Sequence, residues 1–261
     1  QDNSVYAGLV EQMDDAIGAV LDKLEALGLS ENTIVIFTSD HGGVAAGDDY
    51  ATSNLPLRGG KGYQYEGGLR VPYMINVPWL SHQGIENATP VTGTDFYPTI
   101  LDLAGAKLKP DEHQDGVSLK PLLEGKAIDS RPLYWHYPHY GNQGGRPSSV
   151  IREGQWKLIR YHSDDSQALY NLKDDPGETT NIIDQHGDLA AELSKQLMNF
   201  LEDTGAKFPH KDPLYNAKAE QKYLEQVERE LIPRLEKQRM NYLSPDYNPG
   251  NNWWGSQSEQ E

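Results

Sequence analysis

The sequence predicts an α/β fold, because helical and strand patterns alternate in its first part and several strands follow one another later. Apolar residues recur at helical spacing from Val5 to Leu27, and Gly28 ends the pattern. A β-branched and aromatic run at 32–38 is typical of a strand buried in a parallel sheet. Helix, short loop and strand form the repeating unit of α/β proteins.

Two polar residues, Asp40 and His41, follow this predicted strand and precede two glycines. Open α/β sheets place their ligand sites at the carboxyl ends of strands. Asp40 offers a hard anionic oxygen and His41 a neutral nitrogen, so the pair predicts two ligands of a divalent cation. The alternative is that Asp40 caps the next segment and His41 is a surface loop residue.

The segment 44–63 is rich in glycine, proline and polar residues, which is typical of a loop at a ligand site. Lys61 lies in it between glycines and offers a compact positive charge to an anionic substrate oxygen. Asp48 and Asp49 in the same loop could add metal oxygens, but we expect them to be solvated.

The next elements are a strand at 70–78, bounded by prolines, and a helix at 94–105 with Pro98 in its first turn. Beyond a polar stretch at 111–131, the pattern changes to successive strands with a hairpin turn at Glu153-Gly154. These strands are expected at 133–137, 149–152, 155–162 and 168–172, and an amphipathic helix at 187–201 covers them.

The chain therefore divides into three predicted parts. Residues 1–130 form the end of a large α/β domain, 131–207 form a small antiparallel subdomain with its helix, and 208–261 form a helical and extended extension. Within the extension, Pro233 is expected to interrupt a partly helical segment. Trp253 and Trp254 near its end could form a sugar platform or dock on the protein itself.

Several short motifs occur in a specific order and spacing. They are Asp14-Asp15-Ala16-Ile17-Gly18, Phe37-Thr38-Ser39-Asp40-His41-Gly42, Leu55-Pro56-Leu57-Arg58-Gly59-Gly60-Lys61-Gly62, Tyr65-Glu66-Gly67-Gly68-Leu69-Arg70-Val71-Pro72, Thr94-Asp95-Phe96-Tyr97-Pro98-Thr99, and Leu169-Tyr170-Asn171-Leu172 with Asp175-Pro176-Gly177-Glu178. Together they resemble the C-terminal half of a formylglycine-dependent (type I) sulfatase of the alkaline-phosphatase-like superfamily. The resemblance covers residues 6 to about 201 and implies the C-terminal part of that fold's large mixed or parallel sheet, followed by its small antiparallel subdomain.

The resemblance also implies roles for individual residues. Asp40 matches a calcium-ligand aspartate, His41 matches the adjacent ligand position, and Lys61 matches a catalytic lysine that binds the sulfate. In the family, a formylglycine hydrate attacks sulfur and releases the alcohol. Arg58 and Arg70 are expected to fix loops, and the Thr94-Asp95 pair to be structural.

The sequence departs from the family pattern at the nucleophile. It contains no cysteine and no Cys/Ser-x-Pro-x-Arg motif, from which formylglycine is made. The nearest mimic has Asn54 in the nucleophile position and is interpreted as structural. The formylglycine, the first pair of metal aspartates and further sulfate ligands are therefore expected in an N-terminal part outside this chain, which could be a separate or cleaved polypeptide. Alone, this chain is expected to be inactive.

An aromatic and basic segment of the small subdomain is a candidate for substrate recognition. Aromatic faces bind sugar rings, and arginine can hold a carboxylate or sulfate through two hydrogen bonds. The candidates are His136, His139 and Arg146. The alternative is that they pack the two subdomains together.

Charge and hydropathy exclude some function classes. The net charge of -16 argues against nucleic-acid binding, which requires a basic surface. No apolar stretch approaches the ~18 residues of a membrane span. The resemblance implies a calcium-dependent sulfatase, periplasmic or secreted, that acts on a sulfated carbohydrate. Two alternatives stay open: a zinc- or manganese-dependent phosphatase or phosphodiesterase of the same superfamily, and a noncatalytic carbohydrate-binding or assembly fragment.

Overall fold

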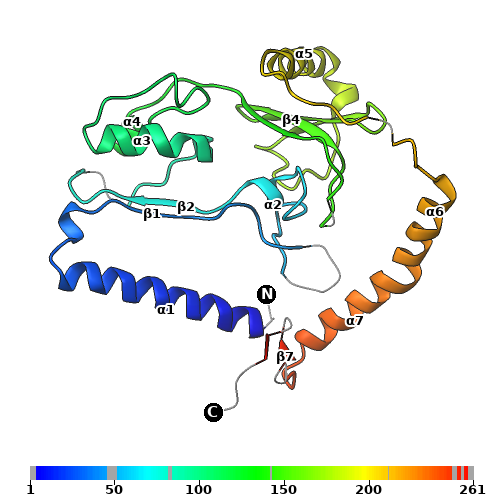
Figure 1. Cartoon of the computed structure of the whole chain (residues 1–261), viewed down its shortest axis with the longest axis horizontal. Coiled ribbons are helices and arrows are strands. Elements are labelled where there is room, and N and C mark those ends of the chain that lie inside the picture. Colours follow the sequence, from blue (N-terminus) through cyan, green and yellow to red (C-terminus); the bar gives the residue numbers. More distant parts are fainter. Residues whose placement is uncertain are drawn as a thin grey trace.

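The computed structural model describes residues 4–45, 52–81, 84–141, 143–210, 212–248, 252–253 and 256–257. Asp48, Asp49 and Trp254 lie outside the described residues, and so does the side chain of Trp253. The architecture is mixed α/β, as predicted, with two main layers of structure: one is built on the antiparallel strands between residues 133 and 171, and the other on the strand pair at 35–38 and 73–76 (Figure 1). No helix in the described ranges is long and apolar enough to cross a membrane.

The first helix, α1 (Ser4–Ala26), ends at Gly28, whose φ of +67° lies in the left-handed region that favours glycine. A short 3-10 turn, η1 (Ser30–Asn32), leads into β1 (Val35–Thr38). Many apolar side chains of α1 are exposed, and Val20 reaches 61%. The helix runs beside β1 and β2 without being covered by the rest of the chain (Figure 1).

The expectation of a buried parallel strand at 32–38 is wrong for the described chain. β1 pairs antiparallel with β2 (Tyr73–Asn76), with Val35 opposite Asn76, and every residue of β1 is partly exposed. A parallel neighbour requires a crossover connection, usually a helix that returns the chain to the same end of the sheet. In the described residues of the connection there is one short helix, α2 (Glu66–Leu69), and the chain returns in the opposite direction.

The predicted antiparallel sheet is confirmed, in the order β3-β4-β5-β6. One expected turn lies a residue later than predicted: Glu153 still pairs with Trp156, so the reversal falls at Gly154-Gln155, and φ of Gly154 is +56°. The four strands are β3 (Leu133–Tyr137), β4 (Ser148–Glu153), β5 (Trp156–Tyr161) and β6 (Gln167–Asn171).

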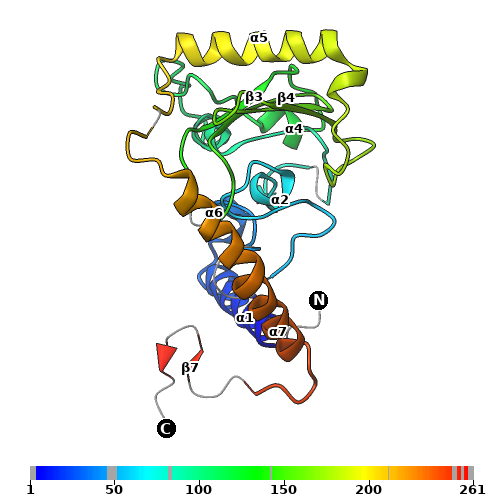
Figure 2. The same cartoon turned by 90° about the vertical axis from the view of Figure 1, so that its right-hand side faces the viewer.

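The two faces of this sheet bury different partners, because successive side chains of a strand point to opposite sides. Helix α5 (Gly187–Asp203), which follows the 3-10 turn η3 (Ile183–Gln185), covers one face, as predicted (Figure 2). There Leu158 packs with Leu193 and Leu197 of the helix, all fully buried. The opposite face packs against Tyr65, beside α2, so the sheet supports the segment that carries Lys61.

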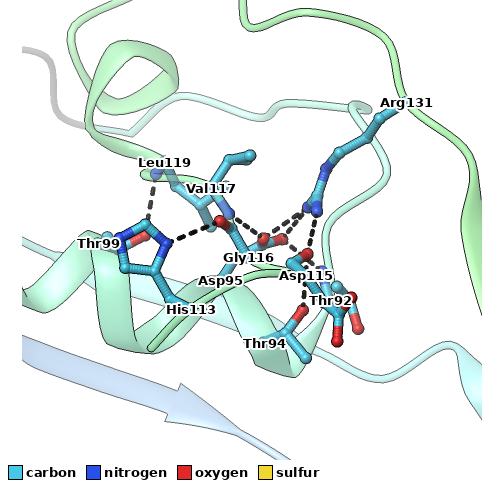
Figure 3. A network of polar contacts seen from close by, with 10 residues as sticks. All are labelled: Thr92, Thr94, Asp95, Thr99, His113, Asp115, Gly116, Val117, Leu119 and Arg131. Carbon is cyan, nitrogen blue, oxygen red and sulfur yellow. Dashed lines mark hydrogen bonds and ion pairs between the residues drawn. The ribbon is translucent and has the colours of Figure 1, made fainter. Parts of the chain in front are cut away.

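A buried carboxylate organises the region between the two layers (Figure 3). Helix α3 (Phe96–Leu103) follows the 3-10 turn η2 (Gly93–Asp95), where Thr92 and Asp95 form a capping box. Asp95 is fully buried; it accepts hydrogen bonds from Val117 N at 2.9 Å and from Arg131 Nη2 at 2.6 Å. The Thr94-Asp95 pair is therefore structural, as expected, and ties α3 to the segment that leads through α4 (Lys120–Leu123) to the sheet.

The C-terminal extension is one continuous helical rod followed by a small hairpin. It consists of α6 (Ala217–Gln226), the π-helical segment η4 (Val227–Leu231) and α7 (Ile232–Tyr242). Pro233 does not interrupt it, because the proline stands in the first turn of α7 directly after the π turn, where its missing N–H is tolerated. The hairpin pairs β7 (Asn252–Trp253) with β8 (Ser256–Gln257).

Candidate functional site

The segment that carries Asp40 and His41 lies directly against the lysine loop, residues 58–62. The backbone N–H of Lys61 donates to the carbonyl of Gly43 at 3.1 Å, and Gly42 N–H donates to Gly68 O at 2.9 Å. The structure thereby brings together two motifs that are separated in the sequence.

Glycine is required where these backbones meet. A Cβ at Gly42 would lie 1.7 Å from the carbonyl oxygen of Gly67, and one at Gly60 would lie 2.3 Å from that of Gly43. Any side chain at either position would drive the two segments apart. The Gly-Gly and Gly-Gly-Lys patterns therefore reflect close packing between backbones.

Asn54 holds the same junction with its side chain. Its amide oxygen accepts from Gly43 N at 3.0 Å, and its nitrogen donates to Gly43 O at 2.8 Å and to Gly59 O at 3.0 Å. The amide thus clamps the strand end to the start of the lysine loop, in keeping with the structural interpretation of this residue.

The side chains of Asp40 and His41 face each other. His41 Nε2 lies 3.2 Å from Asp40 Oδ2, and His41 Nδ1 lies 2.9 Å from the carbonyl oxygen of Gly42. A carbonyl can only accept, so Nδ1 carries the proton, and in the neutral ring Nε2 presents a lone pair toward a carboxylate. Two lone pairs in this arrangement are stabilised by a cation or a proton between them.

The pair fits part of a metal coordination sphere. Calcium–oxygen distances of 2.3–2.6 Å place neighbouring ligand atoms roughly 3.3 Å apart in an octahedral arrangement, close to the observed 3.2 Å. The bond from Nδ1 to a backbone carbonyl is the usual way in which a ligating histidine is oriented. Across the described part of the chain, however, no three His, Cys, Asp or Glu residues come together, so two donors are what these residues supply.

Lys61 is half-buried, and among the described residues its ammonium group makes no hydrogen bond or ion pair. Its backbone is fixed by Gly43, while its side chain retains a positive charge for an external partner. This is the arrangement expected of an anion-binding lysine.

A loop of the small subdomain packs onto the lysine loop. Gly144 has φ of +103°, and a Cβ there would lie 2.1 Å from Cζ of Tyr63. A Cβ at Gly145 would lie 2.1 Å from the carbonyl oxygen of Gly62. The segment that contains the predicted substrate residues is therefore a neighbour of Lys61.

The three predicted substrate residues differ in their engagement. His136 uses both ring nitrogens within the protein, with Nδ1 at 2.7 Å from Ser149 Oγ and Nε2 at 2.8 Å from Lys207 O. His139 is exposed and meets only the edge of the Tyr137 ring in the described structure. His139 is thus more accessible to a ligand than His136.

Arg146 is exposed but engaged. Its Nη2 donates to Ser163 Oγ at 2.7 Å and to Asp164 Oδ2 at 2.6 Å, and its guanidinium lies 4.4 Å from the centroid of the Tyr161 ring. Hydrogen bonds from Ser166, with a further contribution from Arg146, lower the pKa of Asp164 to about 2. A substrate anion would compete with Asp164 for this arginine.

Sequence reasoning missed a buried charge cluster that connects this site to the sheet. Lys157 of β5 is fully buried and forms ion pairs with Glu66 at 3.0 Å and Glu178 at 2.8 Å. Two signals pointed to it: Lys157 stands beside an apolar strand run, and Glu178 ends the Asp-Pro-Gly-Glu motif. Neither signal identifies the partner, because the three residues are far apart in the sequence.

Comparison with known proteins agrees with this architecture. The family model "Sulfatase" matches residues 1–106, and the model "N-sulphoglucosamine sulphohydrolase, C-terminal" matches residues 60–206, more than half of the chain. Fold and matches together define a C-terminal region of the alkaline-phosphatase-like superfamily. The chain belongs to the sulfatase family.

Curated relatives match over much of this chain but over less of their own length. A sulfatase from Formosa agariphila is 38% identical over 220 residues, covering 75% of this chain and 39% of the relative. An N-acetylglucosamine-6-O-sulfatase from Bacteroides thetaiotaomicron is 32% identical over 214 residues, covering 80% of this chain and 36% of that relative. A steryl-sulfatase from Rattus norvegicus is 40% identical over 141 residues, covering 52% and 24%. The chain spans well under half of the length of these relatives.

Solved structures share the fold. The crystal structure of Ps i-CgsB in complex with k-i-k-neocarrahexaose superposes with a TM-score of 0.65 at 24% identity, covering 90% of this chain and 50% of that one. A structure in complex with its substrate D-glucosamine-2-N,6-O-disulfate gives a TM-score of 0.54 at 30% identity, covering 75% and 38%. At 24% identity, the similarity to the structure of Ps i-CgsB shows a shared fold alone.

Proposed function

We propose that this chain is part of a sulfuric ester hydrolase that acts on a sulfated carbohydrate. The observation that carries the proposal is the hydrogen bond from Lys61 N–H to Gly43 O, because it joins the backbone of Lys61, whose ammonium group has no partner among the described residues, to the segment that carries Asp40 and His41. Anion-binding and cation-binding groups next to each other suit a substrate whose oxygens contact both.

The residues present have distinct roles in this proposal. Asp40 and His41 would hold a calcium ion, which when bound polarises the sulfate oxygens. The bond from His41 Nδ1 to Gly42 O fixes the ring so that Nε2 faces the ion. Lys61 would hold the sulfate and stabilise the negative charge that moves onto its oxygens. The attacking group, a formylglycine in the family, is expected outside this chain.

A carbohydrate substrate is favoured over a steroid by the extent of the similarity. The relative named for N-acetylglucosamine-6-O-sulfate covers 80% of this chain, whereas the steryl-sulfatase match covers 52%. His139 and Tyr140 carry exposed rings in the segment whose Gly144 and Gly145 pack on the lysine loop, and such rings suit contact with a sugar face. His136 and Arg146 belong to the same segment and stay candidates, with Arg146 requiring release from Asp164.

The remaining catalytic groups would come from an N-terminal part outside this chain, which could be a separate or cleaved polypeptide and would pack against the residues described. Exposed apolar side chains on α1, such as Leu9 at 53% and Val20 at 61%, suit burial against such a partner. We retain the division at residues 130 and 207 and the assignment to the periplasm or to secreted proteins as predictions.

The decisive experiment pairs identification of the isolated protein with an activity assay. Intact mass and N-terminal sequencing show whether a polypeptide bearing Cys/Ser-x-Pro-x-Arg co-purifies, and hydrolysis of an aryl sulfate and of glucosamine 6-sulfate is then followed with and without calcium. The proposal is supported if calcium-dependent sulfate release is lost in Lys61→Ala and kept in Lys109→Ala. Lys109 is the control because it is an exposed lysine that pairs with Glu112.

Other outcomes select the alternatives. Release of phosphate from aryl phosphates with zinc or manganese, without sulfate release, would make the protein a phosphatase of the same superfamily. Binding of sulfated sugar that survives Lys61→Ala, with no turnover, would make it a noncatalytic binding fragment.

A further inference from the structure

Four charged side chains meet between α2 and the four-stranded sheet, and three of them are buried while the fourth, Arg152, is partly exposed. Lys157 Nζ lies 3.0 Å from Glu66 Oε1 and 2.8 Å from Glu178 Oε1, and the three side chains are exposed by 0%, 4% and 0%. Arg152 Nη1 adds a contact of 3.2 Å to Glu66 Oε2. The two positive and two negative charges balance, so removing one leaves a buried charge without compensation.

Such a cluster contributes little net stability to the folded protein. Taking charges out of water costs several kcal/mol per ion, roughly as much as their attraction returns, and apolar residues of similar volume often do as well. Ion pairs differ from apolar contacts because they specify which atoms lie next to each other. The segments of the chain that this cluster connects therefore indicate its role.

Glu178 joins the sheet subdomain to Arg58 at the start of the lysine loop and to Glu66, four residues after its end. Its Oε2 accepts from the backbone N–H of Glu66 at 2.6 Å, and its carbonyl accepts from Arg58 Nη1 at 2.8 Å. Arg58 precedes Lys61 and Glu66 follows it. The guanidinium of Arg58 also lies 4.0 Å from the centroid of the Tyr65 ring, on the sheet-facing side of the same loop.

The loop between these attachment points is closed. Gly67 N–H donates to Arg58 O at 2.9 Å, and Tyr63 N–H donates to Gly60 O at 2.9 Å. Lys61 stands inside this ring of hydrogen bonds, with its own N–H bound to Gly43. A shift of Glu178 would therefore be transmitted to Lys61 and to the segment that carries Asp40.

The backbone of Glu178 has φ of +51°, a left-handed conformation that costs a non-glycine residue energy and persists where surrounding contacts enforce it. Burial also raises the pKa of Glu178, and Lys157 opposes this rise. Both facts agree with a side chain whose position is dictated by its partners.

We propose that Glu178 and Lys157 are positioning residues, which hold the lysine loop against the sheet and so fix Lys61 for anion binding. The anion-binding part rests on the proposed function of Lys61. Both residues are buried and touch no substrate; they act through Glu66 and Arg58.

The test compares local exchange with global stability in the full 261-residue chain. Lys157→Met removes the buried charge and keeps much of the side-chain volume. Arg58→Gln removes the bond to the Glu178 carbonyl from an exposed residue, so this variant folds even if Lys157→Met does not. Arg160→Gln is the matched control, because Arg160 lies on the same strand and pairs with the exposed Asp165.

The first readout is amide hydrogen exchange measured by NMR. We expect exchange at Lys61 and Gly42 to accelerate at least about tenfold in Lys157→Met and Arg58→Gln, equivalent to about 1.4 kcal/mol of local opening. In Arg58→Gln the amides of Leu158 and Leu169 in the sheet should keep their rates, as should all amides in Arg160→Gln. Unchanged exchange at Lys61 in Arg58→Gln, or equal acceleration at every amide of that variant, overturns the positioning role.

The second readout is binding of inorganic sulfate, followed by chemical shifts. Affinity should fall in Lys61→Ala and also in Arg58→Gln, and stay constant in Arg160→Gln. If sulfate binding is unaffected by Lys61→Ala, the proposed function of Lys61 fails, whereas the exchange result still decides whether Glu178 and Lys157 hold the loop.

Discussion

The backbone N–H of Lys61 donates to the carbonyl oxygen of Gly43 at 3.1 Å, and this bond unites the two halves of the candidate site. One half is a strand end with a carboxylate and an imidazole, the other a loop with an ammonium group. The side-chain amide of Asn54 bridges the two halves by bonding to Gly43 and Gly59. The two halves themselves meet through their backbones, which is why glycines surround the junction.

The ligand pair should bind calcium weakly in this chain, because calcium takes six to eight oxygen ligands and Asp40 and His41 supply two donors. We expect a dissociation constant of about 1 mM or weaker, typical of open sites. A calcium titration followed by the amide shifts of residues 40–43 measures it. Asp40→Asn should abolish the shifts, and Asp129→Asn, at an exposed position, should retain them. Shifts that persist in Asp40→Asn would place the ion elsewhere.

Arg131→Gln should strongly destabilise the protein, because it leaves the buried carboxylate of Asp95 without its counter-charge. Removing one partner of a buried ion pair costs about 3–5 kcal/mol. Urea unfolding followed by circular dichroism gives the change in unfolding free energy. Lys109→Gln, which breaks an exposed pair with Glu112, should leave the urea midpoint unchanged. A small effect of Arg131→Gln would mean that backbone donors alone stabilise Asp95.

Stability should decrease in mild acid because of His162. Burial, together with the neighbouring His136 and Arg160, lowers the pKa of His162 below its usual 6.5. Between that lowered pKa and 6.5 the unfolded chain binds more protons than the folded one, so the unfolding free energy falls as pH falls. Urea unfolding at about pH 7, 6 and 5 should show this slope, and His162→Gln should reduce it. His139→Gln, at an exposed ring, should keep the slope of the unmodified protein.

Gly144→Ala should disrupt the contact between the small subdomain and the lysine loop. The new methyl group would lie 2.1 Å from Tyr63 Cζ in a backbone with φ of +103°. Gly205→Ala is the matched control, since its φ is +63° and a Cβ there meets nothing within 4 Å. We expect Gly205→Ala to cost about 1–2 kcal/mol of unfolding free energy from backbone strain alone, and Gly144→Ala to cost about 1–3 kcal/mol more from overpacking. Equal costs would show that the loop yields without strain.

The local pattern of the sequence determined most elements of this protein. Alternating apolar residues fixed the strands β3 to β6, helical periodicity fixed α1 and α5, and Gly28 and Gly154 marked the reversals, because these signals depend on neighbouring residues. The family motifs likewise singled out Asp40, His41 and Lys61 as candidates.

Only the tertiary structure decided how these pieces meet. It made β1 antiparallel to β2, kept the helix intact at Pro233 through a π turn, engaged His136 within the subdomain, and paired Lys157 with Glu66 and Glu178. Each of these depends on residues that are distant in the sequence or on a backbone adjustment that relieves a local conflict. Contacts over such separations leave no periodic trace along the chain, so the arrangement of the site follows from packing.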